Sequence, residues 1–289
     1  MQCLLSIDVE DFFHAEYVKY KVNSRCDKSG FIIPEVLEFL DNMQAKATFF
    51  VVGEIFEKSP EILEQIQEKG HEIGFHGYSH TCLDQLTPKS FQKEIDKFNS
   101  ILSLTSLEKP IGFRAPSLSL NNNTKWALKV LQKNNFLYDS SICPTKSLLY
   151  GVSKAPIKPY KVSFDDVTKE NNNGKIWEFP VLTFKLPLIG FRIPMAGGFY
   201  LRFFPVELMK QALKKIISKG YPGLIYVHSW EICPEHILSN HLVKHKLGFF
   251  RSFVTYYNIK KSKKKLKKLL SNFKFTSIKN YIEKNNFIQ

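Results

Sequence analysis

The chain has 289 residues, of which 44% are hydrophobic and 24% are charged, and its formal net charge is +14. These hydrophobic and charged fractions are ordinary for a globular protein, so they exclude a disordered chain and allow a large buried core. No window of about 18 uncharged apolar residues occurs, which argues against a membrane-spanning helix. The start MQCLLSIDVEDFF has no basic flank and Asp8 interrupts its apolar run, so we do not expect a secretory signal peptide.

Charge and cysteine usage narrow the class of protein further. Lysine and arginine crowd the chain after His241, so the positive charge indicates a basic tail and not a basic fold. The cysteines are odd in number, far apart and without a CxxC pair, which favours reduced thiols in the cytoplasm over a disulfide framework. They are Cys3, Cys26, Cys82, Cys143 and Cys233. A barrel of strands and helices fits this length as one unit, so we expect a catalytic barrel over residues 1–235 and a basic helical extension over 236–289.

The first half of the chain alternates short apolar strands with amphipathic helices. The first strand, Cys3 to Val9, ends in an acidic cluster of Asp8, Glu10 and Asp11. The alternation then predicts a helix over Phe31–Met43, a strand over Ala47–Val52, a helix opening at Ser59 and Pro60, a strand over Glu72–Phe75, a helix from Thr87 to about Leu104, a strand over Gly112–Ala115, a helix over Thr124–Asn134 and a strand over Leu137–Ser140. Such alternation indicates a parallel sheet, open or closed into a barrel.

The pattern fails between Cys143 and Lys175, where a surface loop is expected. Beyond it we expect a strand near Trp177 to Val181 and a crowded turn at the AGGFY segment, where glycine supplies permissive backbone dihedrals. A helix from Pro205 to about Lys219 and a strand from Leu224 to His228 follow. The second half therefore continues the alternation with one interruption.

The basic tail KKSKKKLKKLLSNFKF places apolar residues at helical spacing among lysines. One interpretation is a solvated helix that docks its leucine stripe, Leu266, Leu269 and Leu270, on the barrel. The other is a basic amphipathic helix that binds anionic lipid and brings the protein to lipid-linked glycans. Nucleic-acid binding is not expected, because no recognised module accompanies the charge.

Imidazoles and carboxylates follow several of the predicted strands. In HEIGFHGYSH, His76 and His80 are four residues apart after a short strand, and neutral imidazole is the commonest metal ligand in proteins. One carboxylate from elsewhere would complete a facial triad with open positions for water and substrate. Arg114, Asp139 and His228 stand at further strand ends. Because the carboxyl ends of barrel strands meet on one face, these groups are expected around a single ion.

Five segments at these strand ends occur in order: SIDVED, HGYSH, RAPS, YDSS and YVHSWE. From about Leu4 to Glu231 the chain closely resembles the NodB-type polysaccharide deacetylases, the carbohydrate esterase family that removes acetyl groups from N-acetylated sugars. The VEDFF, EFPV, AGGFY and FRSFVTYYN segments are similar to the subgroup found with exopolysaccharide and exosortase loci. The resemblance implies a distorted (β/α) barrel and a metal-dependent hydrolase.

The resemblance also implies site residues. Asp8 would be the general base, and His76 and His80 would bind the metal together with an acidic residue of the first motif. Val9 stands where that family usually has its metal-binding aspartate. Glu10 is the first choice for the acidic metal ligand, because its side chain would point the same way as that of Asp8 from a strand. Asp11 is the alternative.

The remaining roles carry over in the same way. Arg114 would pair with Asp8 and favour its ionised form. Asp139 would orient and charge His228, whose imidazolium protonates the departing amine. Structural ion pairs at Arg114 and Asp139, and a core histidine at His228, are the alternatives. Trp230 and Glu231 are expected in packing and a structural hydrogen bond. The other histidines are expected in loops or at the surface, with His14 near the acidic cluster; they are His14, His71, His236, His241 and His245.

The implied reaction is removal of an N-acetyl group from an amino sugar in a polysaccharide, peptidoglycan or a glycan precursor. Zinc is the expected ion, although cobalt, nickel or iron suits the same donors. The rivals are hydrolysis of another amide, such as an N-formyl sugar or a ureide, and a catalytically silent glycan-binding barrel. The expected partner is an N-acetylated glycan, and the expected place is the cytoplasm, with contact to the inner face of the membrane through the basic tail.

Overall fold

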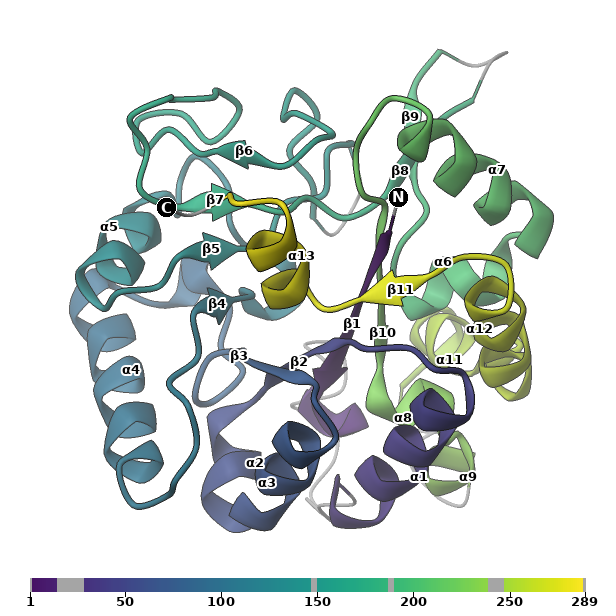
Figure 1. Cartoon of the computed structure of the whole chain (residues 1–289), viewed down its shortest axis with the longest axis horizontal. Coiled ribbons are helices and arrows are strands. Elements are labelled where there is room, and N and C mark those ends of the chain that lie inside the picture. Colours follow the sequence, from purple (N-terminus) through teal and green to yellow (C-terminus); the bar gives the residue numbers. More distant parts are fainter. Residues whose placement is uncertain (1, 15–28, 147–149, 187–189, 239–246, 288–289) are drawn as a thin grey trace.

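A curled sheet wrapped by helices forms the centre of the computed structural model, which describes residues 2–14, 29–146, 150–186, 190–238 and 247–287 (Figure 1). The strand order of the described sheet is β10-β1-β2-β3-β4-β5-β7-β6, with β11 beside β1. Its strands are β1 (Cys3–Val9), β2 (Thr48–Val51), β3 (Glu72–Phe75), β4 (Gly112–Phe113), β5 (Tyr138–Asp139), β6 (Tyr160–Lys161), β7 (Trp177–Glu178), β10 (Leu224–His228) and β11 (Phe275–Thr276).

Helices cover the outside of this sheet and lie between successive strands. They are α1 (Ser29–Asn42), α2 (Gly53–Lys58), α3 (Pro60–Glu68), α4 (Pro88–Leu102), α5 (Trp126–Lys133), α6 (Gly198–Phe203), α7 (Val206–Ile217), α8 (Ser229–Ile232), α9 (Glu235–Leu238), α11 (Phe249–Tyr256), α12 (Ser262–Leu270) and α13 (Ile278–Lys284). Short 3-10 turns stand at Phe12–His14, Leu83–Gln85, Pro116–Leu118 and Ile259–Lys261.

The pairing of the strands confirms the predicted distorted β/α barrel. The strands from β1 to β5 pair in parallel with their neighbours, as do β10 with β1 and β7 with β5, whereas β6 runs antiparallel to β7. A parallel bridge between Val181 and Leu224 joins the segment after β7 to β10. The sheet therefore curls until its two ends approach each other, and its strands end on a common face.

The first strand shows how the sheet presents polar groups inside. Every residue of β1 is buried, as expected of a strand covered on both faces. Ser6 and Asp8 both contact Arg114, because residues two apart share one face of a strand. The register then places Asp8 beside His228 of β10 and beside Phe50 of β2.

Element boundaries differ from the sequence prediction at a few points. The second strand was expected to run to Val52 and the next helix to open at Ser59 and Pro60, but Gly53 already begins helix α2. Ser59 stands at the N-cap of α3 as predicted, yet its side chain makes no capping hydrogen bond. The predicted cap at Thr87 is confirmed, since its side chain accepts the backbone N-H of Ser90 at 3.2 Å. The region expected as loop contains β6, and β8 (Thr183–Lys185) with β9 (Arg192–Pro194) forms a separate antiparallel hairpin.

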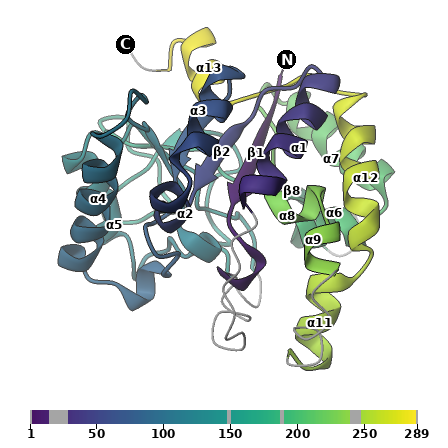
Figure 2. The same ribbon diagram turned by 90° about the horizontal axis from the view of Figure 1, so that it is seen from below.

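The basic extension docks on the barrel and contributes to it. The leucine stripe of α12 is buried, which confirms the docked-helix interpretation: Leu266 and Leu269 have no exposed surface. Strand β11 pairs with the start of β1, and α13 covers the end of the sheet where β1 begins (Figure 2). The extension therefore shares its core with the barrel, and a domain boundary near residue 235 stays a prediction.

Two further expectations concern membranes and thiols. Among the described residues, no helix combines the length and the apolar character needed to cross a bilayer. Cys3, Cys82, Cys143 and Cys233 are buried free thiols, and Cys26 lies outside the described residues. Burial raises the pKa of the Cys143 thiol to about 12, which keeps it protonated and unreactive.

Candidate active site

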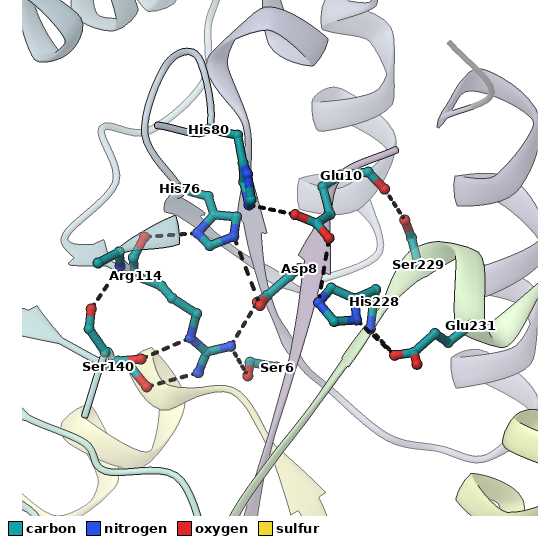
Figure 3. A network of polar contacts seen from close by, with 12 residues as sticks. Ser6, Asp8, Glu10, His76, His80, Arg114, Ser140, His228, Ser229 and Glu231 are labelled. Carbon is teal, nitrogen blue, oxygen red and sulfur yellow. Dashed lines mark hydrogen bonds and ion pairs between the residues drawn. The ribbon is translucent and has the colours of Figure 1, made fainter. Parts of the chain in front are cut away.

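Side chains from four parts of the chain meet above the carboxyl end of β1 (Figure 3). The sheet brings Asp8 from the end of β1, Arg114 from the residue after β4 and His228 from the end of β10. Glu10 follows β1 by one residue, and His76 follows β3. His80 completes the group from the loop after β3. These six side chains were expected to meet because they stand at or near strand ends in the sequence.

Glu10, His76 and His80 form a buried group whose ligand atoms all lie within 4.8 Å of one another. Glu10 Oε2 lies 2.5 Å from His80 Nε2. His76 Nδ1 lies 2.8 Å from the carbonyl oxygen of Arg114, and donation to that carbonyl leaves Nε2 as the lone-pair nitrogen facing the group. Two imidazoles and one carboxylate are a donor set that suits zinc. The group contains Glu10, the first choice from the sequence, and not Asp11.

The surroundings of this group keep Glu10 ionised and His76 neutral. Burial alone would raise the pKa of Glu10, but the positive charges available at His80 and His228 outweigh burial and hold that pKa well below its usual range. Burial lowers the pKa of His76 to about 4, against the opposing effect of Asp8. The carboxylate is therefore ionised and His76 neutral near pH 7, which are the states that bind a cation.

The predicted pairing of Arg114 with Asp8 is confirmed. Arg114 Nη1 lies 2.7 Å from Asp8 Oδ1 and also 2.7 Å from Ser6 Oγ. Arg114 Nε and Nη2 donate to the carbonyl and hydroxyl oxygens of Ser140 at 2.8 and 2.9 Å. The guanidinium carbon lies 4.3 Å from the centre of the Phe50 ring. With both of its edges occupied and an aromatic ring on one face, Arg114 holds Asp8 in one orientation.

The predicted contact between Asp139 and His228 is wrong. Asp139 Oδ1 instead accepts the hydroxyl of Ser141 at 2.6 Å, and Oδ2 accepts the Ser141 backbone N-H at 3.0 Å. The Ser141 hydroxyl in turn accepts the backbone N-H of Ala115, which follows Arg114. Burial raises the pKa of Asp139 and of its neighbour Glu178. Asp139 therefore orders the segment that carries Arg114. Its distance from His228 follows from its place at β5, because four strands lie between β5 and β10 along the sheet.

Glu231 takes the place beside His228 that Asp139 was expected to fill. His228 Nδ1 lies 2.8 Å from Glu231 Oε2, and His228 Nε2 lies 3.5 Å from Glu10 Oε1. Burial would lower the pKa of His228, but the carboxylates of Glu10 and Glu231 outweigh burial and raise it to about 9. The imidazolium is thus the form present near pH 7, as an acid requires.

The loop that carries the two histidines is held by groups that the sequence did not single out. Gly77 adopts a φ of +73°, a left-handed conformation that glycine enters without strain. Glu94 of α4 accepts the backbone N-H of Tyr78 at 2.9 Å and the hydroxyl of Ser79 at 2.6 Å. Glu94 sits in an ordinary amphipathic helix, so nothing in its sequence context marks it.

Two of the histidines expected in loops or at the surface, His14 and His71, are buried. His14 accepts the backbone N-H of Asp11 at 3.0 Å, and its ring centre lies 5.8 Å from that of His80. His71 accepts the backbone N-H of Ala47 at 3.2 Å. Burial lowers the pKa of both imidazoles, that of His71 to about 4. His14 therefore borders the candidate metal group, while His71 serves the fold at the start of β3; His241 and His245 lie outside the described residues.

Comparison with known families assigns the first half of the chain. A family model described as polysaccharide deacetylase matches residues 27–136, and a model described as a domain of unknown function (DUF3473) matches residues 140–283. The chain carries a polysaccharide deacetylase domain. In this polysaccharide deacetylase domain, the family match contains His76, His80 and Arg114, while the structure adds Asp8, Glu10 and His228 from outside the matched residues.

Individual relatives agree with this assignment. The polysaccharide deacetylase domain is 32% identical over 120 residues to the peptidoglycan deacetylase-like protein FGM2 of Gibberella zeae, covering 41% of this chain and 35% of that protein. It is 38% identical over 95 residues to a peptidoglycan-N-acetylglucosamine deacetylase of Bacillus cereus, covering 32% of this chain and 34% of that one. The chain thus spans about a third of the length of these curated relatives.

The fold has a match among solved structures as well. A putative polysaccharide deacetylase from Mycobacterium smegmatis aligns over 98% of this chain and 89% of its own length, with a TM-score of 0.57 and 16% identity. At that identity the match concerns the fold. It extends beyond the deacetylase domain into the segment matched by the model of unknown function, so both segments belong to one architecture.

Proposed function

We propose that this protein is a metal-dependent hydrolase that removes N-acetyl groups from an amino sugar in a polysaccharide, peptidoglycan or a glycan precursor. The observation that carries the proposal is the position of Asp8 and His228 beside the group formed by Glu10, His76 and His80. A base, a cation site and an acid within one buried cluster are the parts that amide hydrolysis requires. The similarity to peptidoglycan deacetylases supports an N-acetylated glycan as substrate.

The donors fit a divalent ion of the zinc type, and cobalt, nickel or iron suits the same set. Such an ion, held by Glu10, His76 and His80, would polarise the acetyl carbonyl and make a water at the site more acidic. Asp8 Oδ2, 3.9 Å from His76 Nε2, stands where it can accept the proton of that water. Asp8 Oδ1 is held by Arg114, so Oδ2 is the oxygen left to act as base.

His228 supplies the acid. Its side chain is 24% exposed, whereas those of Asp8, Glu10, His76 and His80 are almost fully buried, so it stands where the site opens to substrate. Donation of the Nε2 proton to the amide nitrogen accompanies cleavage of the C-N bond and yields acetate and the free amine.

Two alternative functions differ from N-deacetylation in the chemistry they require. An N-formyl sugar or a ureide would use the same cluster, and a silent glycan-binding barrel would use none of its acid and base groups. The joint presence of Asp8, His228 and the candidate metal group favours the enzyme, because a binding protein has no need of all of them.

The test is acetate release from N-acetylglucosamine oligomers and lipid-linked glycan intermediates, with and without a chelator. We expect release by the wild type, loss with chelator, and a decrease of about 10² to 10⁴-fold in kcat for Asp8→Asn. His76→Ala should lose bound metal together with activity. The control is Glu207→Gln, which changes a carboxylate on α7 that is 70% exposed. Formate release, or an inactive wild type with metal bound, would favour the rivals.

The cellular compartment of the protein and its contact with membrane lipid are also proposals. The buried free thiols support a reducing compartment such as the cytoplasm. Because the leucine stripe of α12 packs inward, we propose that any contact with anionic lipid is made by its exposed lysines: Lys263, Lys264, Lys267 and Lys268. Flotation with anionic liposomes, compared between the wild type and a variant with these four changed to glutamine, tests this contact. Equal flotation of both proteins would show that these lysines do not bind the liposomes. The exopolysaccharide subgroup is supported by the resemblance of its segments alone.

A further inference from the structure

A buried set of charged groups leads from His228 away from the candidate metal group. Glu231 Oε2 lies 2.8 Å from His228 Nδ1 and accepts the backbone N-H of His228 at 3.0 Å. The other oxygen, Oε1, lies 2.9 Å from Arg202 Nη2. Glu231 and Arg202 are each 1% exposed, so water does not screen the ion pair between them. Both oxygens of Glu231 thus have a charged partner, one in the site and one behind it.

Arg202 is itself fixed from the far side by helix α11. Its Nη1 donates to the carbonyls of Thr255 and Tyr257 at 2.9 Å, and its Nη2 donates to the carbonyl of Val254 at 3.0 Å. The last carbonyls of a helix have no partner within the helix, and a guanidinium near them is favourable in charge and in hydrogen bonding. Arg202 therefore connects the C-terminal end of α11 to Glu231.

Gly198 makes this arrangement possible. A Cβ atom placed on Gly198 would lie 1.5 Å from Glu231 Oε2, far inside van der Waals contact. The Gly198 carbonyl also accepts Arg202 Nε at 3.1 Å. The AGGFY segment thus has a specific steric reason for its second glycine, which is the room taken by the carboxylate of Glu231.

We infer that Glu231 is the positioning residue of the acid His228, and that Arg202 and Gly198 hold Glu231 in place. The inference rests on the proposed function. An imidazole whose Nδ1-H is bound to a fixed carboxylate presents Nε2 to the substrate in one ring orientation. The Trp230 ring stacks on His228, with ring centres 5.1 Å apart and planes at 10°. This stacking restricts rotation of the imidazole out of its plane.

The proton step then balances without further groups. The Nε2-H bond of the imidazolium breaks as an N-H bond forms on the leaving nitrogen and the C-N bond breaks. His228 is left as neutral imidazole with its proton on Nδ1, still bound to Glu231. Glu231 neither gains nor loses a proton in this step, so its role is to orient the imidazole.

Kinetics on the zinc-loaded full chain test the inference. For Glu231→Gln, which adds no heavy atom, we expect kcat for acetate release from the glycan to fall at least about 10-fold, with KM and zinc affinity unchanged. Gly198→Ala and Arg202→Met should likewise lower kcat while leaving KM and zinc affinity unchanged. Arg202→Lys should retain more of the wild-type kcat than Arg202→Met. Glu207→Gln is the matched surface control. An unchanged kcat for Glu231→Gln would overturn the inference.

The leaving group separates positioning from general damage. 4-Nitrophenyl acetate releases a phenolate that needs no proton, so Glu231→Gln should retain ester hydrolysis while losing amide hydrolysis. A parallel loss on both substrates would mean that Glu231 only supports the structure, and would overturn the inference.

A spectroscopic measurement separates this inference from the proposed function. In protein labelled with ¹⁵N-histidine, His228 should show a hydrogen-bonded Nδ1 proton that Glu231→Met, which has no oxygen acceptor, removes and Glu207→Gln preserves. The same Nδ1 signal in wild type and Glu231→Met would overturn the inference whatever the activity. The predicted signals in a protein that releases no acetate from any glycan would support the positioning and refute only the proposed function.

Discussion

Arg114 Nη1 lies 2.7 Å from Asp8 Oδ1, and both side chains are buried, at 0% and 4% exposure. Breaking such a pair leaves a charge without water or partner, which costs about 3–5 kcal/mol. We therefore expect Arg114→Met to lower the free energy of unfolding by that amount, measured by urea denaturation. The hydroxyl and carbonyl of Ser140 would lose their donors as well.

The control for this prediction is Lys69→Met, which breaks an exposed pair with Asp41 on α1. Exposed pairs contribute about 0–1 kcal/mol, so its effect should be small. A loss below about 1 kcal/mol for Arg114→Met would show that Asp8 is solvated or protonated without its partner, against the buried pair seen here.

Metal binding should depend on Glu10 and not on its neighbour. Glu10→Gln removes a charged oxygen from the group of ligand atoms that lie within 4.8 Å of one another. We expect zinc affinity, measured by titration calorimetry, to fall at least about 10- to 100-fold for Glu10→Gln. Asp11→Asn serves as the comparison, because Asp11 is the neighbouring carboxylate in the sequence but does not belong to the candidate metal group. A larger loss for Asp11→Asn would reverse the assignment.

The fold was predictable where local pattern and global architecture agree. The strand ending at Val9 and the helix capped at Thr87 carry apolar periods and stop signals that need no distant partner. Strand β11 was not predictable, because two residues form it only by pairing with β1, whose partner Cys3 lies more than 250 residues earlier in the chain. Such short strands owe their existence to tertiary contact.

The sequence predicted most residues of the site, but it predicted less well which of them contact each other. Asp8, His76 and His228 stand at strand ends, where chain order and strand direction suffice to bring them together. The partner of His228 depends on how far along the curled sheet each strand lies, and no motif encodes that distance. Glu231 is three residues from His228 on the first turn of α8, so local geometry could have found it. The fixed order of motifs favoured Asp139 instead.

The C-terminal extension should be required for stability. Ile278 is fully buried in the common core, and its backbone N-H donates to Thr48 Oγ1 on β2 at 2.9 Å. Ile278→Ala should lower the free energy of unfolding by about 2–5 kcal/mol. Leu104→Ala is the control, because Leu104 is 86% exposed and its loss should change little. Equal effects would mean that the extension folds apart from the barrel.

His71 should make the protein less stable as the pH falls. Burial holds its pKa at about 4 in the folded chain, below the ordinary value of 6.5. Between these values the unfolded chain binds a proton that the folded chain does not, so unfolding becomes easier as the pH decreases. The contribution is complete above about pH 6.5 and is lost by about pH 4, a difference of roughly 3 kcal/mol.

The measurement is urea denaturation between pH 4 and pH 7.5 for the wild type and for His71→Gln. A glutamine oxygen can accept the Ala47 N-H that His71 Nδ1 accepts, yet it does not titrate. The variant should therefore lose less stability than the wild type over this range, while the two differ little above pH 7. His71 precedes β3 and His76 follows it, so bound metal at the far end of the strand should leave this difference unchanged. Parallel curves for the two proteins would show that His71 is protonated in the folded chain, and its bond to Ala47 would then have to be absent.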